Sequence, residues 1–473
     1  MALQVVSMEQ AYLSYLVADY SSHDSLDMWR RRCVFCSVRG RAGEHVSAGR
    51  PLHAPPTRLP PRRLGGLWRD ADFVRLWTAQ AVSAVGSQVT LLALPLTALI
   101  VLHARAYEVA LLSTAGSLPN LLGIAAAVWV DRVRRRPVMI AADLGRAALL
   151  VSAPVAYGLG ILTLPQLYVI AVVSGSLSIL FEIASQAYLP TVVARTDLME
   201  ANAKFEASRV VASAAGPGAA GGLISLVTAP VALLADAASF VASALLIGCV
   251  SRRDEGPQVA RHGARATRRD LREGGRYVLG HQYLRPLLLS HSLANLALGL
   301  VWAIVIVYAV RQLGLTAALV GVVLSLGQIG GFAGATFGRK VAERLGVGRT
   351  VVAAFFLFGP ATLLLAVAPR NAAIIFLALG WTLENLARAL YSVSATSVRQ
   401  ALVPDRLQAR VTGFTTTAGT GAFPLGTAIG GALAGGLGLR QAMLIGALVS
   451  FLPFIPVTAS PIRSLRELPA LAD

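Results

Sequence analysis

Apolar segments about as long as a membrane is thick recur along the chain from Phe73 onward. A helix needs about 20 apolar residues to cross roughly 30 Å of hydrocarbon. Helices also satisfy their own backbone hydrogen bonds within lipid. We therefore predict an all-α, polytopic membrane protein with twelve transmembrane helices. The predicted spans are residues 74–101, 107–130, 138–160, 166–189, 208–227, 230–250, 286–310, 316–337, 350–368, 372–395, 411–435 and 440–459.

Positive charge alternates between the loops that join these spans. The loops after spans 2, 6, 8 and 10 carry net charges of +3, +5, +3 and +2, whereas the short loops after odd-numbered spans hold only isolated residues such as Arg105, Arg311, Arg370 and Arg440. Basic loops stay on the cytoplasmic side of a membrane. We therefore expect a multi-pass protein of the cell membrane with both termini in the cytoplasm.

The overall composition agrees with lipid as the solvent. Of all residues 55% are hydrophobic and 14% are charged, against about 25% charged in soluble proteins. The net charge of +18 would suit a nucleic-acid partner only on a basic face of a soluble fold. Because the basic residues lie in short loops, we predict a lipid bilayer as partner and no nucleic acid.

An internal repeat divides the predicted spans into two halves. Asp131 and Glu343 begin similar acid–Arg segments and are 343 − 131 = 212 residues apart. Gln186 and Gln400 begin similar segments that are 400 − 186 = 214 residues apart. Repeats with equal topology pack around an axis normal to the membrane, so we predict two six-helix halves.

These features give five expected regions. The first is poor in long apolar runs and rich in proline, and we interpret it as a disordered cytoplasmic extension. Two six-helix halves follow, separated by a basic cytoplasmic linker whose later part, 271–284, can form an interfacial helix. The regions are 1–70 (extension), 71–250 (first half), 251–285 (linker), 286–460 (second half) and 461–473 (cytoplasmic tail).

The loop after span 2 carries a recognisable signature. Residues 127–136 read Ala-Val-Trp-Val-Asp-Arg-Val-Arg-Arg-Arg and resemble the GxxxDRxGRR pattern of the major facilitator superfamily, with two glycines replaced. Residues 186–190, 201–203, 206–209, 216–217 and 399–400 are similar to its macrolide-efflux and enterobactin-exporter branch. The resemblance covers about residues 69–460 and implies a secondary transporter that exports small amphipathic compounds.

The resemblance also implies a cytoplasmic gate. In this family the loop acid and arginines hold the two halves together when the protein faces outward, and charges at helix ends can also pair with helix dipoles. The alternative is that the arginines only set topology, which is our interpretation for Arg134. The predicted gate residues are Asp131, Arg132, Arg135, Arg136, Glu343 and Arg344.

Small residues and prolines mark spans 5 and 11. Span 5 contains Gly216, Pro217 and Gly221, and span 11 contains Pro424. Small residues let helix backbones approach closely, and proline bends a helix. A Gly-Pro motif in span 5 is typical of exporters of the family, so its presence favours export; close packing alone explains it equally well.

Charged residues inside the spans are the candidates for coupling and substrate binding, because such residues are costly in a membrane. Glu384 ranks first, and Arg388 lies one turn away on the same face and can pair with it. Asp236 and Glu182 follow. The alternative is that the charged residues inside the spans only form local ion pairs or join helices. We favour this alternative for a further pair, Asp143 with Arg146. The neutral Ser87 and Gln88 of span 1 can also line a cavity.

Span 1 departs from the family pattern. Many proton-coupled drug exporters carry an acid there, whereas residues 73–102 contain none. A detailed proton mechanism therefore cannot be carried over from the family. Aromatic side chains are candidates for a pocket that accepts a greasy compound: Trp302, Tyr308, Phe355, Phe356, Trp381 and Tyr391.

The main hypothesis is a proton-coupled exporter of a small organic compound that works by alternating access, as a monomer. A nutrient importer of the same fold and a membrane sensor or scaffold without transport remain as alternatives. We expect no enzyme and no cofactor, since the sequence has no phosphate-binding loop or nucleophile–base set. The Cys33–Cys36 pair lacks the further ligands that a zinc site needs.

Overall fold

The computed structural model describes residues 66–252 and 264–465, and every regular element within these ranges is helical. This confirms the all-α membrane fold. Ten of the described helices are long and apolar enough to cross a membrane. The longer helices of the first part are α3 (Ala71–Leu96), α4 (Ala106–Ser117), α5 (Gly123–Val130), α6 (Arg135–Gly158), α7 (Leu164–Val192), α8 (Leu198–Val227) and α9 (Ala229–Gly248).

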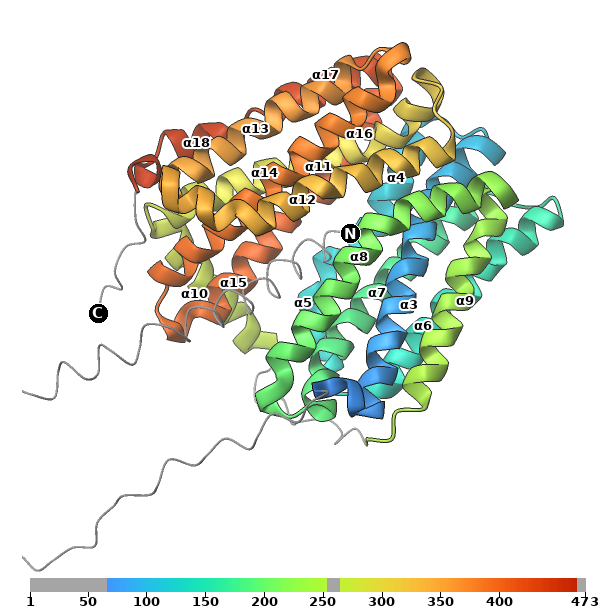
Figure 1. The fold of residues 1–473 in the computed structure, drawn as a ribbon, viewed down its shortest axis with the longest axis horizontal. Coiled ribbons are helices and arrows are strands. Elements are labelled where there is room, and N and C mark those ends of the chain that lie inside the picture. The colour runs from blue at the N-terminus through green and yellow to red at the C-terminus, as the bar shows by residue number, and fades with distance from the viewer. Residues whose placement is uncertain (1–65, 253–263, 466–473) are drawn as a thin grey trace, which may run out of the picture.

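The remaining helices belong to the second part of the chain. They are α10 (Ala264–Gly280), α11 (Leu284–Val307), α12 (Ala317–Leu345), α13 (Val347–Val367), α14 (Ala373–Leu402), α15 (Asp405–Thr420), α16 (Ala422–Leu437), α17 (Leu439–Val449) and α18 (Phe454–Thr458). Figure 1 shows α3–α9 side by side as one group and α11–α18 as another. We call these the first and second groups.

Two predicted spans are interrupted in the structure. The span at 107–130 consists of α4, the short 3₁₀ turn η3 (Leu118–Leu122) and α5. Pro119 lies in that turn, and proline disfavours a continuous α-helix because it lacks a backbone N–H. The span at 411–435 is divided between α15 and α16, which meet at Gly421. The count of twelve spans therefore stays a prediction.

Local sequence determines where several helices begin and end. Asp70 caps α3, because its Oδ1 accepts the backbone N–H of Asp72 at 3.0 Å. Gly346 and Gly438 have φ angles of 88° and 92° and separate consecutive helices. Such angles are strained for residues with a Cβ, so glycine permits these sharp reversals.

The repeat is visible in the backbone. The π-helical turns η2 (Thr97–Val101) and η5 (Tyr308–Gln312) follow α3 and α11 at equivalent places, 308 − 97 = 211 residues apart. Residues with positive φ follow each turn at the same offset: His103 at 51° and Gly314 at 75°. The two groups thus share this irregularity after their first long helix.

The groups contact each other near one end of the bundle. One hydrophobic cluster there includes residues of both, such as Leu96, Ile224, Ile304 and Val320. At the other end each group has separate clusters of its own. We call the first the closed end, which carries the connections at 102–105 and 313–316. The second is the open end, which carries those at 131–134, 193–197 and 403–404.

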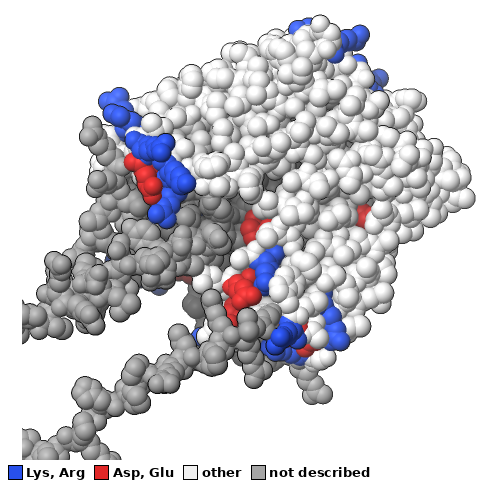
Figure 2. Space-filling model, in the orientation of Figure 1, with Lys and Arg blue, Asp and Glu red and all other residues white. Residues whose placement is uncertain are grey.

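The outer surface of the bundle is apolar. Leu226, Ile375 and Leu448 are 84%, 68% and 67% exposed. Figure 2 shows that charged side chains gather near the ends and in the hollow between the groups, while most of this face carries none. Lipid solvates such a surface, and water does not.

The regions outside the spans are partly described. The predicted extension lies almost wholly outside the described residues, but Gly66–Arg69 form the 3₁₀ turn η1. Trp68 of this turn packs on Trp77 with ring centroids 4.8 Å apart. The predicted linker helix at 271–284 corresponds to α10, which packs against α15. In the predicted tail, Leu465 O accepts the backbone N–H of Gly348 at 2.9 Å.

Candidate functional site

A cavity of about 700 Å³ lies between the two groups. Its walls are formed mainly by α3, α7 and α8, with contributions from α4, α6, α9, α11 and α16. The lining extends to Pro190, Leu198 and Asn202 near the open end. The cavity therefore reaches from the middle of the bundle toward that end, in the size range of small-molecule sites.

Asp236 of α9 lies at the cavity wall against α3. Asp236 is only 1% exposed. Thr90 donates a hydrogen bond to its Oδ2, and Ser239 Oγ lies 3.0 Å from its Oδ1. A Cβ at Gly86 would lie 2.6 Å from Asp236 Oδ1. Glycine at that position therefore allows the carboxylate to approach α3 and reach the cavity.

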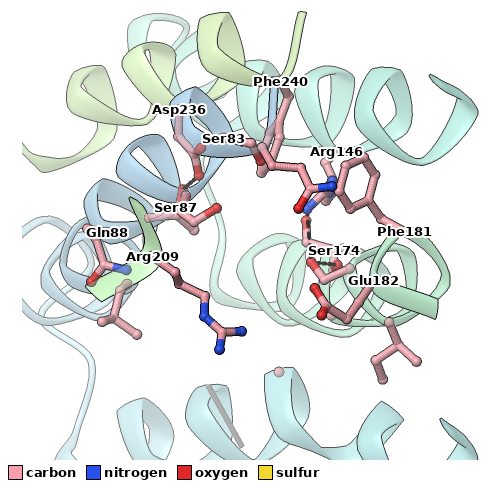
Figure 3. Close-up of a pocket in the computed structure, with 18 of the residues that line it drawn as sticks. Ser83, Ser87, Gln88, Arg146, Ser174, Phe181, Glu182, Arg209, Asp236 and Phe240 are labelled. Atoms are coloured by element: carbon pink, nitrogen blue, oxygen red, sulfur yellow. Dashed lines mark hydrogen bonds between the residues drawn. The ribbon is translucent and has the colours of Figure 1, made fainter. Parts of the chain in front are cut away.

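Arg146 of α6 lies in the cavity wall, surrounded by aromatic and acidic groups. Its guanidinium lies 4.0 Å from the ring centroid of Phe240 and 4.8 Å from that of Phe181, and Figure 3 shows the side chain between these rings. It forms an ion pair with Asp143, which confirms the predicted local pairing. It also donates to Ser178 Oγ at 3.3 Å.

Glu182 and the Glu206–Arg209 pair provide the remaining charges of the lining. Glu182 Oε1 accepts the side-chain amide of Gln186 at 2.8 Å. Arg209 Nη2 lies 2.5 Å from Glu206 Oε2 in an ion pair between residues three apart on α8. Glu182 has no cationic partner of this kind among the described residues.

Ser87 and Gln88 line the cavity from α3, as predicted for neutral polar groups. Gln88 is buried, and it packs directly on Gly216 of α8. A Cβ at Gly216 would lie 2.8 Å from Gln88 Cβ. The predicted packing role of Gly216 is therefore to bring α8 against α3 beside the cavity.

The two groups line the cavity with different chemistry. All charged lining residues within the described ranges belong to the first group. The second group contributes Trp302, Ile306 and Phe423. Of the six aromatic residues predicted for a pocket, Trp302 is the one that lines this cavity. The cavity thus has a charged wall and an apolar wall.

Glu384 lies elsewhere, although the sequence ranked it first. It is buried in α14, and its Oε1 lies 3.1 Å from Arg388 Nη2. The predicted pairing is therefore present. However, neither residue is among those that line the large cavity. The physical reason is that α14 packs against α12 and α13 within the second group, and this face of the helix points into that packing.

The predicted gate residues lie at the open end and are not joined across it. Asp131 and Arg132 are exposed and form no ion pair with another described residue. Arg136 donates to the carbonyl oxygens of Ile247 and Gly248 at 3.1 and 2.5 Å, which ties α6 to α9 within the first group.

The other gate residues also have local surroundings. Arg135 is buried at the start of α6. Glu343 pairs with Arg339 at 2.8 Å on α12, and Arg344 beside it is exposed. No ion pair between described residues therefore links the two groups through these positions in this conformation.

The closed end is held by small residues and hydrogen bonds between the groups. A Cβ at Gly221 of α8 would lie 3.1 Å from Ala318 Cα of α12. Pro217 lies inside α8 one turn earlier, and its carbonyl faces α12. Thr114 Oγ1 of α4 and Thr427 Oγ1 of α16 are 2.9 Å apart.

Pro424 lies in the first turn of α16, three residues before this threonine. Its carbonyl accepts Thr427 Oγ1 at 2.8 Å. All four predicted packing residues therefore lie in α8 and α16, the helices that join the groups.

Sequence reasoning did not single out three charged residues of the lining, Arg146, Glu206 and Arg209, as cavity residues. Arg146 and Arg209 each follow an acid by three residues on a helix. That spacing indicates a local pair, and nothing in it shows which helix face meets the cavity. The helix packing supplies that information.

Comparison with known proteins identifies the family. Residues 67–470 match the family model described as "Transmembrane secretion effector", which is of the major facilitator type. An uncharacterised MFS-type transporter of Bacillus subtilis, YfiS, is 26% identical over 424 residues, which cover 84% of this chain and 94% of that protein.

Solved structures share the fold at low sequence identity. A bacterial homologue of the iron transporter ferroportin in an inward-facing state gives a TM-score of 0.66 at 16% identity, covering 82% of this chain and 98% of that one. The nucleoside transporter NupG gives 0.61 at 14% identity, covering 82% and 98%. The chain is a multi-pass membrane transporter and belongs to the transmembrane secretion effector family of the major facilitator superfamily.

Proposed function

We propose that the protein exports a small amphipathic organic compound across the bacterial cell membrane by alternating access, in exchange for protons. The observation that carries this proposal is the cavity between the two groups, with the buried carboxylate of Asp236 in its wall. A proton carrier must change its charge during the cycle, and a carboxylate in a partly desolvated cavity can do so.

Export is supported by two further features. The matching family is described as a secretion effector, and the Gly-Pro motif at residues 216–217 lies in α8, which joins the groups. The motifs at 186–190 and 399–400 resemble the macrolide-efflux and enterobactin-exporter branch, and we propose substrates of comparable amphipathic character.

The proposed cycle assigns a role to each end of the bundle. With basic loops in the cytoplasm, the open end faces the cytoplasm and admits the substrate. When the closed end separates, Asp131 and Arg132 come together with the corresponding acid–Arg segment of the second group and shut the open end. The two arrangements are the two states of one equilibrium, and we propose that a monomer completes this cycle.

A drug-accumulation panel tests the proposal. Cells with the wild-type protein should retain less of at least one amphipathic compound than cells with Asp236→Asn, and an uncoupler should remove the difference. A matched control is Asp197→Asn, because Asp197 is exposed at the open end and does not line the cavity. Equal accumulation of every compound in all strains would overturn the proposal, and increased uptake would indicate an importer.

A further inference from the structure

The charges around Arg146 do not balance. The carboxylates of Asp143, Asp236 and Glu182 all lie within Coulombic range of its guanidinium. Asp143 forms the direct ion pair. When all four groups are ionised, three negative charges surround one positive charge and leave an excess of two negative charges.

Other charges nearby do not remove this excess. Glu206 and Arg209 form an ion pair that is neutral as a unit. Within the described part of the chain, no cationic side chain of the second group lines the cavity. Uncompensated charge costs several kcal/mol per ion when water is removed, so closing the cavity is favoured when a further positive charge occupies one of the two remaining carboxylates.

The surroundings of Asp236 and Glu182 indicate which of these two carboxylates takes the proton and which takes the ligand. Asp236 is buried and accepts hydrogen bonds from the hydroxyl groups of Thr90 and Ser239, an arrangement that suits a proton as its further positive charge. Glu182 is half-buried at the cavity wall and is held by the neutral amide of Gln186. A ligand that enters the cavity can therefore meet Glu182 directly.

The opposite wall suits the apolar part of such a ligand. Trp302, Ile306 and Phe423 line the cavity from the second group, and Trp302 is backed by Trp381 with ring centroids 5.5 Å apart. Indole rings attract cations through their faces, and their area favours apolar groups. A ligand that spans the cavity would place its charge on one wall and its apolar body on the other.

We infer that the transported compound is a lipophilic monocation whose positive charge binds at Glu182 and whose apolar body packs against Trp302 and Phe423. Arg146 is then a positioning residue: it neutralises one of three carboxylates and leaves Asp236 for the proton and Glu182 for the ligand, which occupy the cavity in turn, as exchange requires. This inference rests on the proposed transport function, because it concerns the same cavity.

Binding to the purified full-length protein tests the charge requirement separately from transport. Methyltriphenylphosphonium and triphenylphosphine oxide have similar size, but only the first carries a positive charge. Calorimetry should show that the cation binds the wild-type protein about tenfold more tightly or better. Glu182→Gln should abolish this preference, and Glu182→Asp should keep it.

Glu200→Gln is the matched control, because Glu200 is exposed and pairs with Lys204 outside the cavity. It should keep the preference for the cation. Equal affinity for both compounds, no binding of the phosphonium at millimolar concentration, or an undiminished preference in Glu182→Gln would each overturn the inference. A preserved preference without any efflux in cells would instead contradict the proposed function alone.

Discussion

The backbone N–H of Gly218 in α8 donates a hydrogen bond to Ser325 Oγ in α12, with 2.9 Å between the two atoms. This bond joins the two groups one residue after Pro217, inside the helix that carries the Gly-Pro motif. An alternating-access cycle must break it whenever the closed end separates. The bond therefore contributes to the stability of one conformation and is absent from the other.

Ser325→Ala should shift the conformational equilibrium toward separation of the closed end. Loss of one hydrogen bond of about 1 kcal/mol changes a two-state population about fivefold. Spin labels at the exposed positions Leu226 and Leu437 would measure the distance between the groups at this end. Thr336→Ala is the control on α12, because Thr336 bonds within its own helix to Phe332 O at 2.8 Å. An unchanged distance distribution in Ser325→Ala would refute the prediction.

Gly221→Ala should reduce transport by about tenfold or more. A Cβ at this position would lie 3.1 Å from Ala318 Cα and closer still to the Ala317 carbonyl. Backbone atoms cannot move aside as a flexible side chain can, so α8 and α12 would be forced apart. Gly222→Ala is a matched control, since nothing lies within 4 Å of a Cβ there. Similar transport rates in the two variants would contradict the close-packing role of Gly221.

The sequence predicted the parts of the fold that depend on hydropathy and small residues. The apolar runs, the repeat and the packing glycines are local properties, and the positions of Gly216 and Gly221 follow from them. The interruption at Pro119 was missed because residues 107–130 are predominantly apolar and long enough for one span. Length and hydropathy alone cannot tell a continuous helix from one that is divided by a turn.

The cavity was harder to predict, because it depends on which helix face points inward. Asp236, Glu182, Ser87 and Gln88 do line it. Glu384 was ranked above them for its central position in span 10, yet its helix face meets the packing within the second group. Depth in the membrane is a property of the sequence, whereas rotation of a helix is decided by its neighbours.

Asp236→Asn should uncouple transport from the proton gradient. The amide can accept and donate hydrogen bonds to Thr90 and Ser239 but cannot release a proton. In proteoliposomes, substrate exchange without a gradient should persist at a rate similar to that of the wild-type protein. Uphill transport driven by a pH gradient should be lost. If uphill transport survives in this variant, Asp236 is not the coupling group.

Glu384→Gln should destabilise the protein without changing the preference for a cationic ligand. The substitution leaves the guanidinium of Arg388 without its carboxylate partner, on a side chain that is only 20% exposed. The expected cost is about 1–3 kcal/mol, visible as a lower unfolding temperature in detergent. The double variant Glu384→Gln with Arg388→Gln should recover part of this loss. A loss of cation preference at normal stability would return Glu384 to the binding site.

Arg410→Ala should loosen α10 from α15 while leaving the rest of the bundle intact. Arg410 Nε lies 2.9 Å from Asp270 Oδ1, and Arg410 Nη1 lies 2.6 Å from Glu273 Oε2. One guanidinium therefore binds two carboxylates of α10. Each partly exposed pair contributes about 0.2–1 kcal/mol, which is enough to alter local opening but too little to unfold the protein.

Amide hydrogen exchange in α10 should therefore become several-fold faster in Arg410→Ala. High salt should also make exchange in α10 of the wild-type protein faster, because it screens these ion pairs. Arg406→Ala is the control, because Arg406 is exposed on the same helix and forms no ion pair with a described residue. Equal exchange in the two variants would show that the contact of Gly274 and Gly275 with α15 holds α10 by itself. In that case the packing of α10 rather than its charge fixes its position, since Gly274 lets α10 approach the backbone at Arg410 and Gly275 lets it approach the ring of Phe414.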